Sequence, residues 1–215
     1  MGEFSSVEAA VDAISQGEVV IVVEAEDQEK GGDFICAAEQ ATPAAVNLVM
    51  SGGGEFYVAI LPNIADQLEL APMSGAATPA QTTPLAAMAH LTTIDHLTAK
   101  TGVTASDRAK TVQAMLDPES RPDAFVRPGH VQPLLAKQGG VLRRAGHTEA
   151  AVDLARLAQR TPAGILCEIL DDNGARASRD YLLELSDEHQ LKIISIESLI
   201  AYRRLREKLV HRAAE

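Results

Sequence analysis

Two histidines, His130 and His147, and the adjacent pair Arg143 and Arg144 lie close together in this sequence, just before an alanine-rich segment with helical character. The first N–H groups of a helix have no partner within it, and the helix dipole adds positive charge there, so a helix start beside arginines favours a bound anion. We expect Thr148 to cap this helix. The segment therefore predicts a phosphate site beside a metal site or an acid–base site.

An acidic segment from Glu24 to Asp33 follows an unbroken β-branched run at Val19 to Val23. One interpretation is a solvated loop, as most charged runs are. The other is a carboxylate loop at the end of a strand that gathers a hard divalent cation, because Mg²⁺ prefers oxygen ligands and keeps waters that a substrate can replace. Composition alone leaves both open.

Glu168 interrupts an apolar run, from 163 to 170, that is typical of a core strand. A carboxylate in such a place needs a partner or a role, because burying an unpaired charge is costly and raises its pKa. Glu168 is therefore a candidate acid–base group. The alternative is a glutamate at the strand edge that points to solvent.

Strands and helices alternate along the chain, which predicts one α/β domain over residues 1–215 with a sheet and surrounding helices. The run at 19–23 predicts a strand covered on both faces. Further strands are expected at 34–39, 56–61, 163–170 and 192–196, with an edge strand at 90–96. Helices are expected at 7–16, 43–50, 109–116 (after a hydroxyl-rich helix start within 101–108), 181–189 and 196–211, and residues 71–88 are expected to form an irregular loop.

Charge and composition exclude several classes of protein. The net charge of −11 argues against a surface that coats nucleic acid, and 3% aromatic residues leave few stacking platforms for single strands. We find no apolar run long enough to span a bilayer and no secretory leader, so we expect no membrane association and a cytoplasmic location. Cys36 and Cys167 lie in apolar contexts and are expected to be buried reduced thiols rather than a disulfide or a nucleophile.

Several motifs together resemble the 3,4-dihydroxy-2-butanone 4-phosphate synthases of riboflavin biosynthesis over nearly the whole chain. They are Arg127-Pro128-Gly129-His130-Val131, Gly139-Gly140-Val141-Leu142, Arg144 to Leu157, Cys167-Glu168-Ile169, Thr101-Gly102-Val103 with Ser106-Asp107-Arg108, and Leu199-Ile200-Ala201-Tyr202-Arg203-Arg204. The resemblance implies an α/β domain with a mixed sheet, a homodimer with active sites shared across its interface, and Mg²⁺ or Mn²⁺ as cofactor. It also implies conversion of ribulose 5-phosphate to the butanone phosphate and formate.

The same resemblance assigns roles to individual residues. It places metal ligands at Glu29 and His147, and an acid–base pair at His130 and Glu168. The positions that it implies for substrate binding are Gln28, Glu29, Asp33, Arg144, Ala145, Gly146, His147, Thr148 and Glu168.

The departures from the family pattern are concentrated in the acidic loop and in the segment from 71 to 99. The family usually has arginine where Gln28 stands and a second carboxylate where Gly31 stands, so a cationic fork and a proton acceptor are both missing. Three hypotheses follow: the family reaction on ribulose 5-phosphate, a diverged enzyme that acts on another sugar phosphate or gives another product, and a non-catalytic scaffold or binding subunit.

Overall fold

The computed structural model of the chain describes residues 3–27, 29, 31–73 and 90–207. The expected loop at 71–88 therefore lies mostly outside the described residues, and so do Gln28 and the last residues of the expected C-terminal helix.

Seven strands form one mixed sheet in the order β4-β5-β3-β6-β2-β1-β7. The pairs β3–β5 and β1–β7 are parallel, and the other neighbours are antiparallel. The strands are β1 Val20–Val23, β2 Gly32–Ala37, β3 Tyr57–Ile60, β4 Ile94–His96, β5 Phe125–Leu135, β6 Gly164–Glu168 and β7 Lys192–Ser195. The edge strand expected at 90–96 is β4, which begins four residues later, and the strand expected at 34–39 begins and ends two residues earlier.

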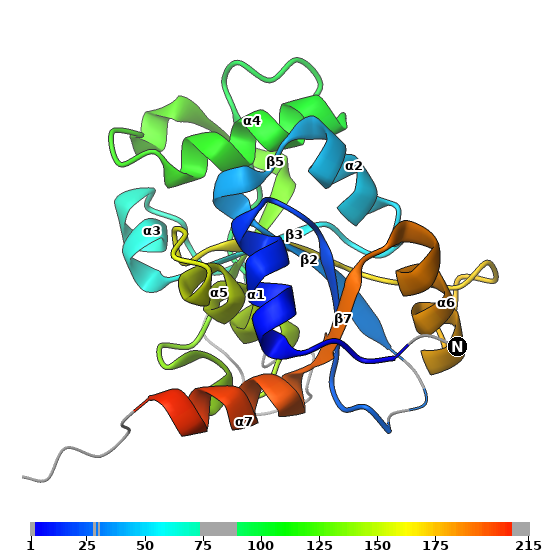
Figure 1. The fold of residues 1–215 in the computed structure, drawn as a ribbon. Helices are drawn as coiled ribbons and strands as arrows, with labels where there is room; N and C mark the ends of the chain where they lie inside the picture. Colours follow the sequence, from blue (N-terminus) through cyan, green and yellow to red (C-terminus); the bar gives the residue numbers. More distant parts are fainter. Residues whose placement is uncertain (1–2, 28, 30, 74–89, 208–215) are drawn as a thin grey trace, which may run out of the picture.

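Helices cover both faces of this sheet, as Figure 1 shows. Helices α1, α5 and α7 contribute side chains to one hydrophobic cluster, and α2, α3, α4 and α6 contribute to the other. The α-helices are α1 Val7–Ser15, α2 Pro43–Met50, α3 Pro62–Gln67, α4 Ala105–Leu116, α5 His147–Leu157, α6 Arg179–His189 and α7 Ile196–Arg206; short 3₁₀ turns lie at Ala38–Gln40, Pro122–Ala124 and Gly140–Leu142. The α/β fold with a mixed sheet is confirmed.

Strand β1 shows why a continuous β-branched run occurs in this chain. Val20 and Val22 pack into the cluster with α1, α5 and α7, whereas Ile21 and Val23 pack into the opposite cluster. Each of these side chains is at most 4% exposed. Burial of one such side chain contributes roughly 1.5–3 kcal/mol, so the strand is held from both faces, as the sequence predicts.

Most helices begin where capping residues predict. The side chains of Ser6, Thr42 and Thr104 accept hydrogen bonds from the backbone of α1, α2 and α4 respectively. The prediction for α5 is wrong, because this helix starts at His147 with Gly146 as its N-cap and no side-chain cap hydrogen bond. Thr148 already lies inside the first turn, so its hydroxyl does not cap the helix and the first N–H groups of α5 lack a side-chain acceptor.

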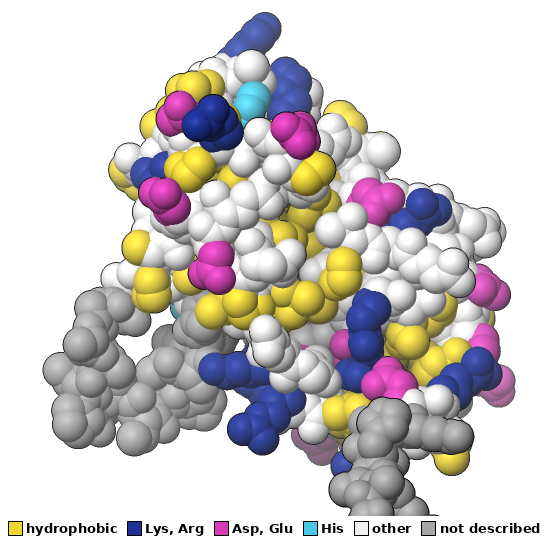
Figure 2. All heavy atoms as spheres, turned by 90° about the vertical axis from the view of Figure 1, so that its left-hand side faces the viewer, with side chains coloured by type: hydrophobic (Ala, Val, Ile, Leu, Met, Phe, Trp, Pro, Cys, Tyr) yellow, Lys and Arg dark blue, Asp and Glu magenta, His cyan; other side chains and the backbone are white. Residues whose placement is uncertain are grey.

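None of the helices in the described ranges is long and apolar enough to cross a membrane. Acidic and basic side chains are interspersed with apolar ones over the described part of the face in Figure 2. This face therefore shows no continuous basic surface of the kind that coats nucleic acid.

Candidate active site

One row of the sheet brings together residues that lie far apart in the sequence. Asp33 of β2 is in register with Val22 of β1 on one side and with Glu168 of β6 on the other. Because residues in register on neighbouring strands point to the same face, the two carboxylates lie side by side on the face covered by α5. The loop that carries the acidic segment joins β1 and β2 one residue pair beyond this row, at the lower edge of the sheet in Figure 1.

A polar pocket of about 460 Å³ opens above this row, at the N-terminus of α5. Seven of the residues expected to bind substrate line it: Asp33, Arg144, Ala145, Gly146, His147, Thr148 and Glu168. Glu24, Tyr57, Leu166 and Arg176 complete the lining. The predicted phosphate cradle and the predicted carboxylates therefore share one pocket.

His147 is oriented by the main chain of β1. Its Nε2 lies 3.1 Å from the carbonyl oxygen of Val22, and its Nδ1 lies 3.9 Å from Oδ1 of Asp33. A carbonyl oxygen only accepts hydrogen bonds, so Nε2 carries the proton and Nδ1 of a neutral imidazole keeps its lone pair. That lone pair faces the carboxylate side of the pocket, as a metal ligand requires.

The two carboxylates of the row have different surroundings. Burial raises the pKa of Asp33 above its ordinary value; a positive charge on His147, when its ring is protonated, lowers this pKa, and the charge of Glu168 raises it. Glu168 is half-exposed and accepts a hydrogen bond of 2.7 Å from Nε of Arg176. It is therefore neither an unpaired buried charge nor a glutamate facing only solvent. Asp33 and Glu168, together with Glu24, are the carboxylates that line this pocket.

Arg144 is fixed at the entrance of α5 by an ion pair. Its Nη1 donates to Oε2 of Glu149 at 2.8 Å, and Glu149 is 1% exposed and also accepts from the backbone N–H of Lys137. The guanidinium keeps further donors for a ligand anion next to the first turn of the helix. Arg143, in contrast, is exposed and does not line the pocket, so the expectation that both arginines serve the anion site is wrong.

His130 is not in this pocket within one chain. Its Nδ1 lies 2.5 Å from Oδ2 of Asp95, its backbone N–H donates to Oδ1 of the same residue, and its side chain is 45% exposed. Glu168 has Arg176 as its partner instead. A single chain therefore does not bring together the expected acid–base pair of His130 and Glu168.

Glu29, the second expected metal ligand, is exposed and lies outside the pocket lining. Its neighbour Gln28 is outside the described residues. Among the side chains that the structure describes, no three of His, Cys, Asp and Glu converge on a closed metal site. The donor types nevertheless fit a hard divalent cation, because Nδ1 of His147 faces a pocket that also contains Glu24, Asp33 and Glu168.

Cys36 and Cys167 are free and buried, as the sequence predicts. Burial raises the pKa of the Cys36 thiol to about 12 and that of Cys167 to about 11. Both are neutral thiols at physiological pH, which argues against a nucleophilic role.

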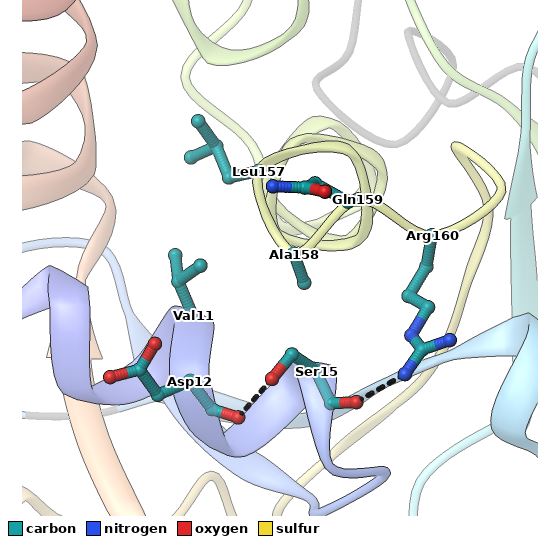
Figure 3. Close-up of a pocket in the computed structure, with 7 residues that line it drawn as sticks. All are labelled: Val11, Asp12, Ser15, Leu157, Ala158, Gln159 and Arg160. Carbon is teal, nitrogen blue, oxygen red and sulfur yellow. Dashed lines mark hydrogen bonds between the residues drawn. The ribbon is translucent and has the colours of Figure 1, made fainter.

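Another hollow, of about 410 Å³, lies between the end of α1 and the end of α5 (Figure 3). Arg160 reaches across it to donate a hydrogen bond of 2.6 Å to the carbonyl oxygen of Ser15. Asp12 is the one acidic residue among those that line it, and no histidine or cysteine does, so it offers less acid–base chemistry than the pocket at α5.

Sequence reasoning missed Asp95, Tyr57 and Arg176. Asp95 and Tyr57 carry no motif, and only contacts between strands reveal their positions. Arg176 follows Asp172-Asn173-Gly174, a sequence typical of a turn, and could have been noticed as a lone cation a few residues beyond Glu168.

These features define an α/β protein whose pocket combines an anion-binding helix start with carboxylates and an imidazole. The chain belongs to the 3,4-dihydroxy-2-butanone 4-phosphate synthase family, whose model matches residues 8–202. It is 46% identical over 213 residues to the riboflavin biosynthesis protein RibBA of Bacillus subtilis (strain 168), an alignment that covers 99% of this chain and 52% of the relative. The chain thus spans about half the length of the curated relatives it matches.

Solved structures agree with this assignment. RibBX of A. baumannii, a two-domain 3,4-dihydroxy-2-butanone 4-phosphate synthase, has a TM-score of 0.88 at 36% identity, over 98% of this chain and 61% of its own. The synthase of Candida albicans has a TM-score of 0.82 at 38% identity, over 93% of this chain and 97% of its own. A synthase in complex with two magnesium ions has a TM-score of 0.84 at 30% identity, over 96% of this chain and all of its own (100%).

Proposed function

We propose that this chain is a metal-dependent lyase that converts ribulose 5-phosphate to 3,4-dihydroxy-2-butanone 4-phosphate and formate. The observation that supports this most directly is the single pocket that contains Asp33, Glu168, His147 and Arg144 at the start of α5. The full-length match to a structure of the Candida albicans synthase adds to it.

The pocket supplies what this reaction needs. Butanone phosphate and formate together contain every atom of ribulose 5-phosphate, so the enzyme has to move protons and rearrange bonds without a net oxidant. Arg144 and the N–H groups at the start of α5 hold the phosphate. Asp33 and Glu168 then lie beside the sugar carbons, where they remove and return protons as the enediol forms, as water is lost, and as water is added back before formate leaves.

A divalent cation, Mg²⁺ or Mn²⁺, would be held by Nδ1 of His147 together with carboxylates of the pocket and Glu29. When bound, it would polarise the carbonyl and hydroxyl oxygens of the sugar. The structure with two magnesium ions among the relatives supports this choice of cofactor.

We further propose a cytoplasmic homodimer with shared active sites. His130 is half-exposed and lies outside the pocket of its own chain, so it is available to the pocket of a second copy. In a symmetric dimer the same contact occurs twice, and each site would then combine Glu168 of one chain with His130 of the other.

Incubation of the purified chain with ribulose 5-phosphate and Mg²⁺ tests the proposed reaction. We expect formate and the butanone phosphate in equal amounts, and loss of both when a chelator removes the metal. Glu168→Gln should lower the rate by roughly 10²–10⁴-fold, because it removes a positioned acid–base group. Glu184→Gln, on the exposed surface of α6, is the control and should leave the rate unchanged. Absence of both products with Mg²⁺ and with Mn²⁺ would exclude this function.

One observation favours a diverged enzyme as the second candidate. Arg176 enters the pocket next to Gly31, where the family pattern has a carboxylate, and the charge around the sugar is thereby altered. Turnover of another pentose or tetrose phosphate faster than of ribulose 5-phosphate would support this candidate. Absence of binding to metal and to sugar phosphates would instead support a scaffold.

A further inference from the structure

Arg176 is held in the pocket by the turn that follows β6. Leu170 and Arg176 form an antiparallel bridge, and the backbone N–H of Ala177 donates to the carbonyl of Ile169 at 3.1 Å. At the tip of the turn, Oδ1 of Asp171 accepts from the N–H groups of Asn173 and Ala175, both at 2.9 Å. The backbone of Arg176 is therefore fixed, and its side chain points back along the strand to Glu168.

The guanidinium of Arg176 occupies space that is open because residue 31 is a glycine. The backbone N–H of Gly31 donates to the carbonyl of Ala177 at 2.9 Å, which brings the acidic loop against the turn. A Cβ atom at position 31 would lie 2.2 Å from Nη2 and 2.6 Å from Cζ of Arg176. Gly31 also has φ +102°, a conformation that other residues rarely adopt. Any side chain at position 31 would therefore have to displace the guanidinium.

The side chain of Arg176 has donors to spare. Its one hydrogen bond to a described residue runs from Nε to Glu168, and a guanidinium carries five N–H donors. Nη2 lies over Gly31, on the side of the pocket that the acidic loop borders. These donors suit the oxygen atoms of an anionic ligand, which a guanidinium binds more strongly than neutral donors do.

We propose that Arg176 is a substrate-binding residue of this pocket, and that Gly31 is the substitution that admits it. The family pattern has a cation at position 28 and a carboxylate at position 31. In this chain the cation is Arg176, in the turn after β6, and it occupies the space that a side chain at position 31 would need. The ligand is a sugar phosphate, and the proposal rests on the proposed function.

The direct test is the affinity of the Mg²⁺-loaded protein for ribulose 5-phosphate, measured by calorimetry. Arg176→Met removes the charge and the donors but keeps an unbranched side chain, and we expect affinity to fall about tenfold or more. Arg176→Lys should recover part of the loss, because lysine keeps the charge without the fork of donors. Arg206→Met is the matched control, since Arg206 forms a comparable exposed ion pair, of 2.8 Å with Glu8, and does not line the pocket.

A double-mutant cycle tests the role of Gly31. Gly31→Ala introduces backbone strain whatever residue stands at position 176, so its cost is compared with and without Arg176→Ala. We expect Gly31→Ala to weaken binding several-fold more in the presence of Arg176 than in the Arg176→Ala background, because only the former contains the steric conflict. Equal costs in the two backgrounds would contradict the coupling.

The outcomes separate this inference from the proposed function. Ribulose 5-phosphate binding that depends on Arg176 without formate release leaves the inference standing and removes the proposed reaction. Normal formate release by Arg176→Met, with unchanged affinity for ribulose 5-phosphate, would overturn the inference and leave the proposed reaction standing. A large effect of Lys30→Met with no effect of Arg176→Met would assign the relocated cation to Lys30 and overturn the inference. Failure of the wild-type protein to bind either ribulose 5-phosphate or inorganic phosphate would overturn both.

Discussion

Oδ2 of Asp95 lies 2.5 Å from Nδ1 of His130, and Oδ1 of the same carboxylate accepts the backbone N–H of His130 at 3.0 Å. The pairing of β4 with β5 jumps from Ile94–Val131 to Asp95–Val126, so residues 127–130 bulge out beside Asp95. A carboxylate in this position fixes both the orientation of the ring and the proton on Nδ1, and leaves Nε2 free to take up a proton. Asp95 thus fixes the orientation of the His130 ring, as the acid–base role proposed for His130 would require.

Asp95→Asn should lower kcat for formate release by about 10–100-fold, the usual cost of losing a carboxylate that orients a histidine. KM should change little, because Asp95 does not line the pocket proposed to bind the sugar phosphate. The pH dependence of kcat should also shift, which a purely structural role would not cause. Asp123→Asn, an exposed change in the turn before β5, is the control. Unchanged kcat and pH profile in Asp95→Asn would contradict a positioning role.

Mixing two inactive variants tests whether active sites are shared between copies. His130→Ala and Glu168→Gln should each be inactive alone. If each site combines His130 of one chain with Glu168 of the other, a mixed dimer contains one intact site, and an equal mixture should recover about a quarter of the wild-type activity. Formate release after the two variants are unfolded and refolded together is the measurement. No recovery, although size analysis shows that the refolded mixture is dimeric, would mean that each site uses residues of one chain.

Local signals made much of the fold predictable. The β-branched run in β1 and the caps at Thr42 and Thr104 act over a few residues, so the sequence displays them directly. The start of α5 was less predictable, because Gly146 and Thr148 are both acceptable N-caps and only the extended backbone of Gly146 decides between them.

Contacts between segments that are distant in the sequence were harder to predict. The family resemblance supplied Asp33 and Glu168 as separate residues, and the register of β2 with β6 explains why they are neighbours. Asp95 and His130 are 35 positions apart and meet only because of a bulge, which no hydrophobic period encodes. The departure at Gly31 was visible in the sequence, but the arginine that occupies its space comes from a turn far along the chain.

A buried ion pair links the last helix to the segment that leads into the pocket. Nη1 of Arg203 donates to Oδ2 of Asp153 at 2.6 Å and to the carbonyl of Gly139 at 2.9 Å, and both side chains are 3% exposed. Arg203→Met leaves the buried carboxylate without its main partner and should lower the free energy of unfolding by about 3 kcal/mol.

The neighbouring arginine provides the control for this change. Arg204 is exposed on the same helix, and Arg204→Met should alter the free energy of unfolding by no more than about 0.5 kcal/mol. Denaturant unfolding of both variants measures the difference. If the two variants were equally stable, the ion pair of Arg203 with Asp153 would stabilise the fold no more than an apolar side chain at position 203 does.

Glu39 links the end of β2 to the segment before β6 in a way that depends on pH. Hydrogen bonds from the backbone N–H and then the hydroxyl of Thr161 lower the pKa of Glu39 below its ordinary value of 4.5. A carboxyl group with a lower pKa in the folded protein stabilises the fold above its unfolded pKa, and this contribution is lost as the pH falls through the folded pKa. The Tm of Glu39→Gln should therefore fall below that of the wild type at neutral pH, and the two values should converge below pH 4.5.

Glu18→Gln, at an exposed position, controls for the change in net charge. A difference in Tm between Glu39→Gln and the wild type that persists unchanged at acid pH would show that the carboxylate charge is not the cause.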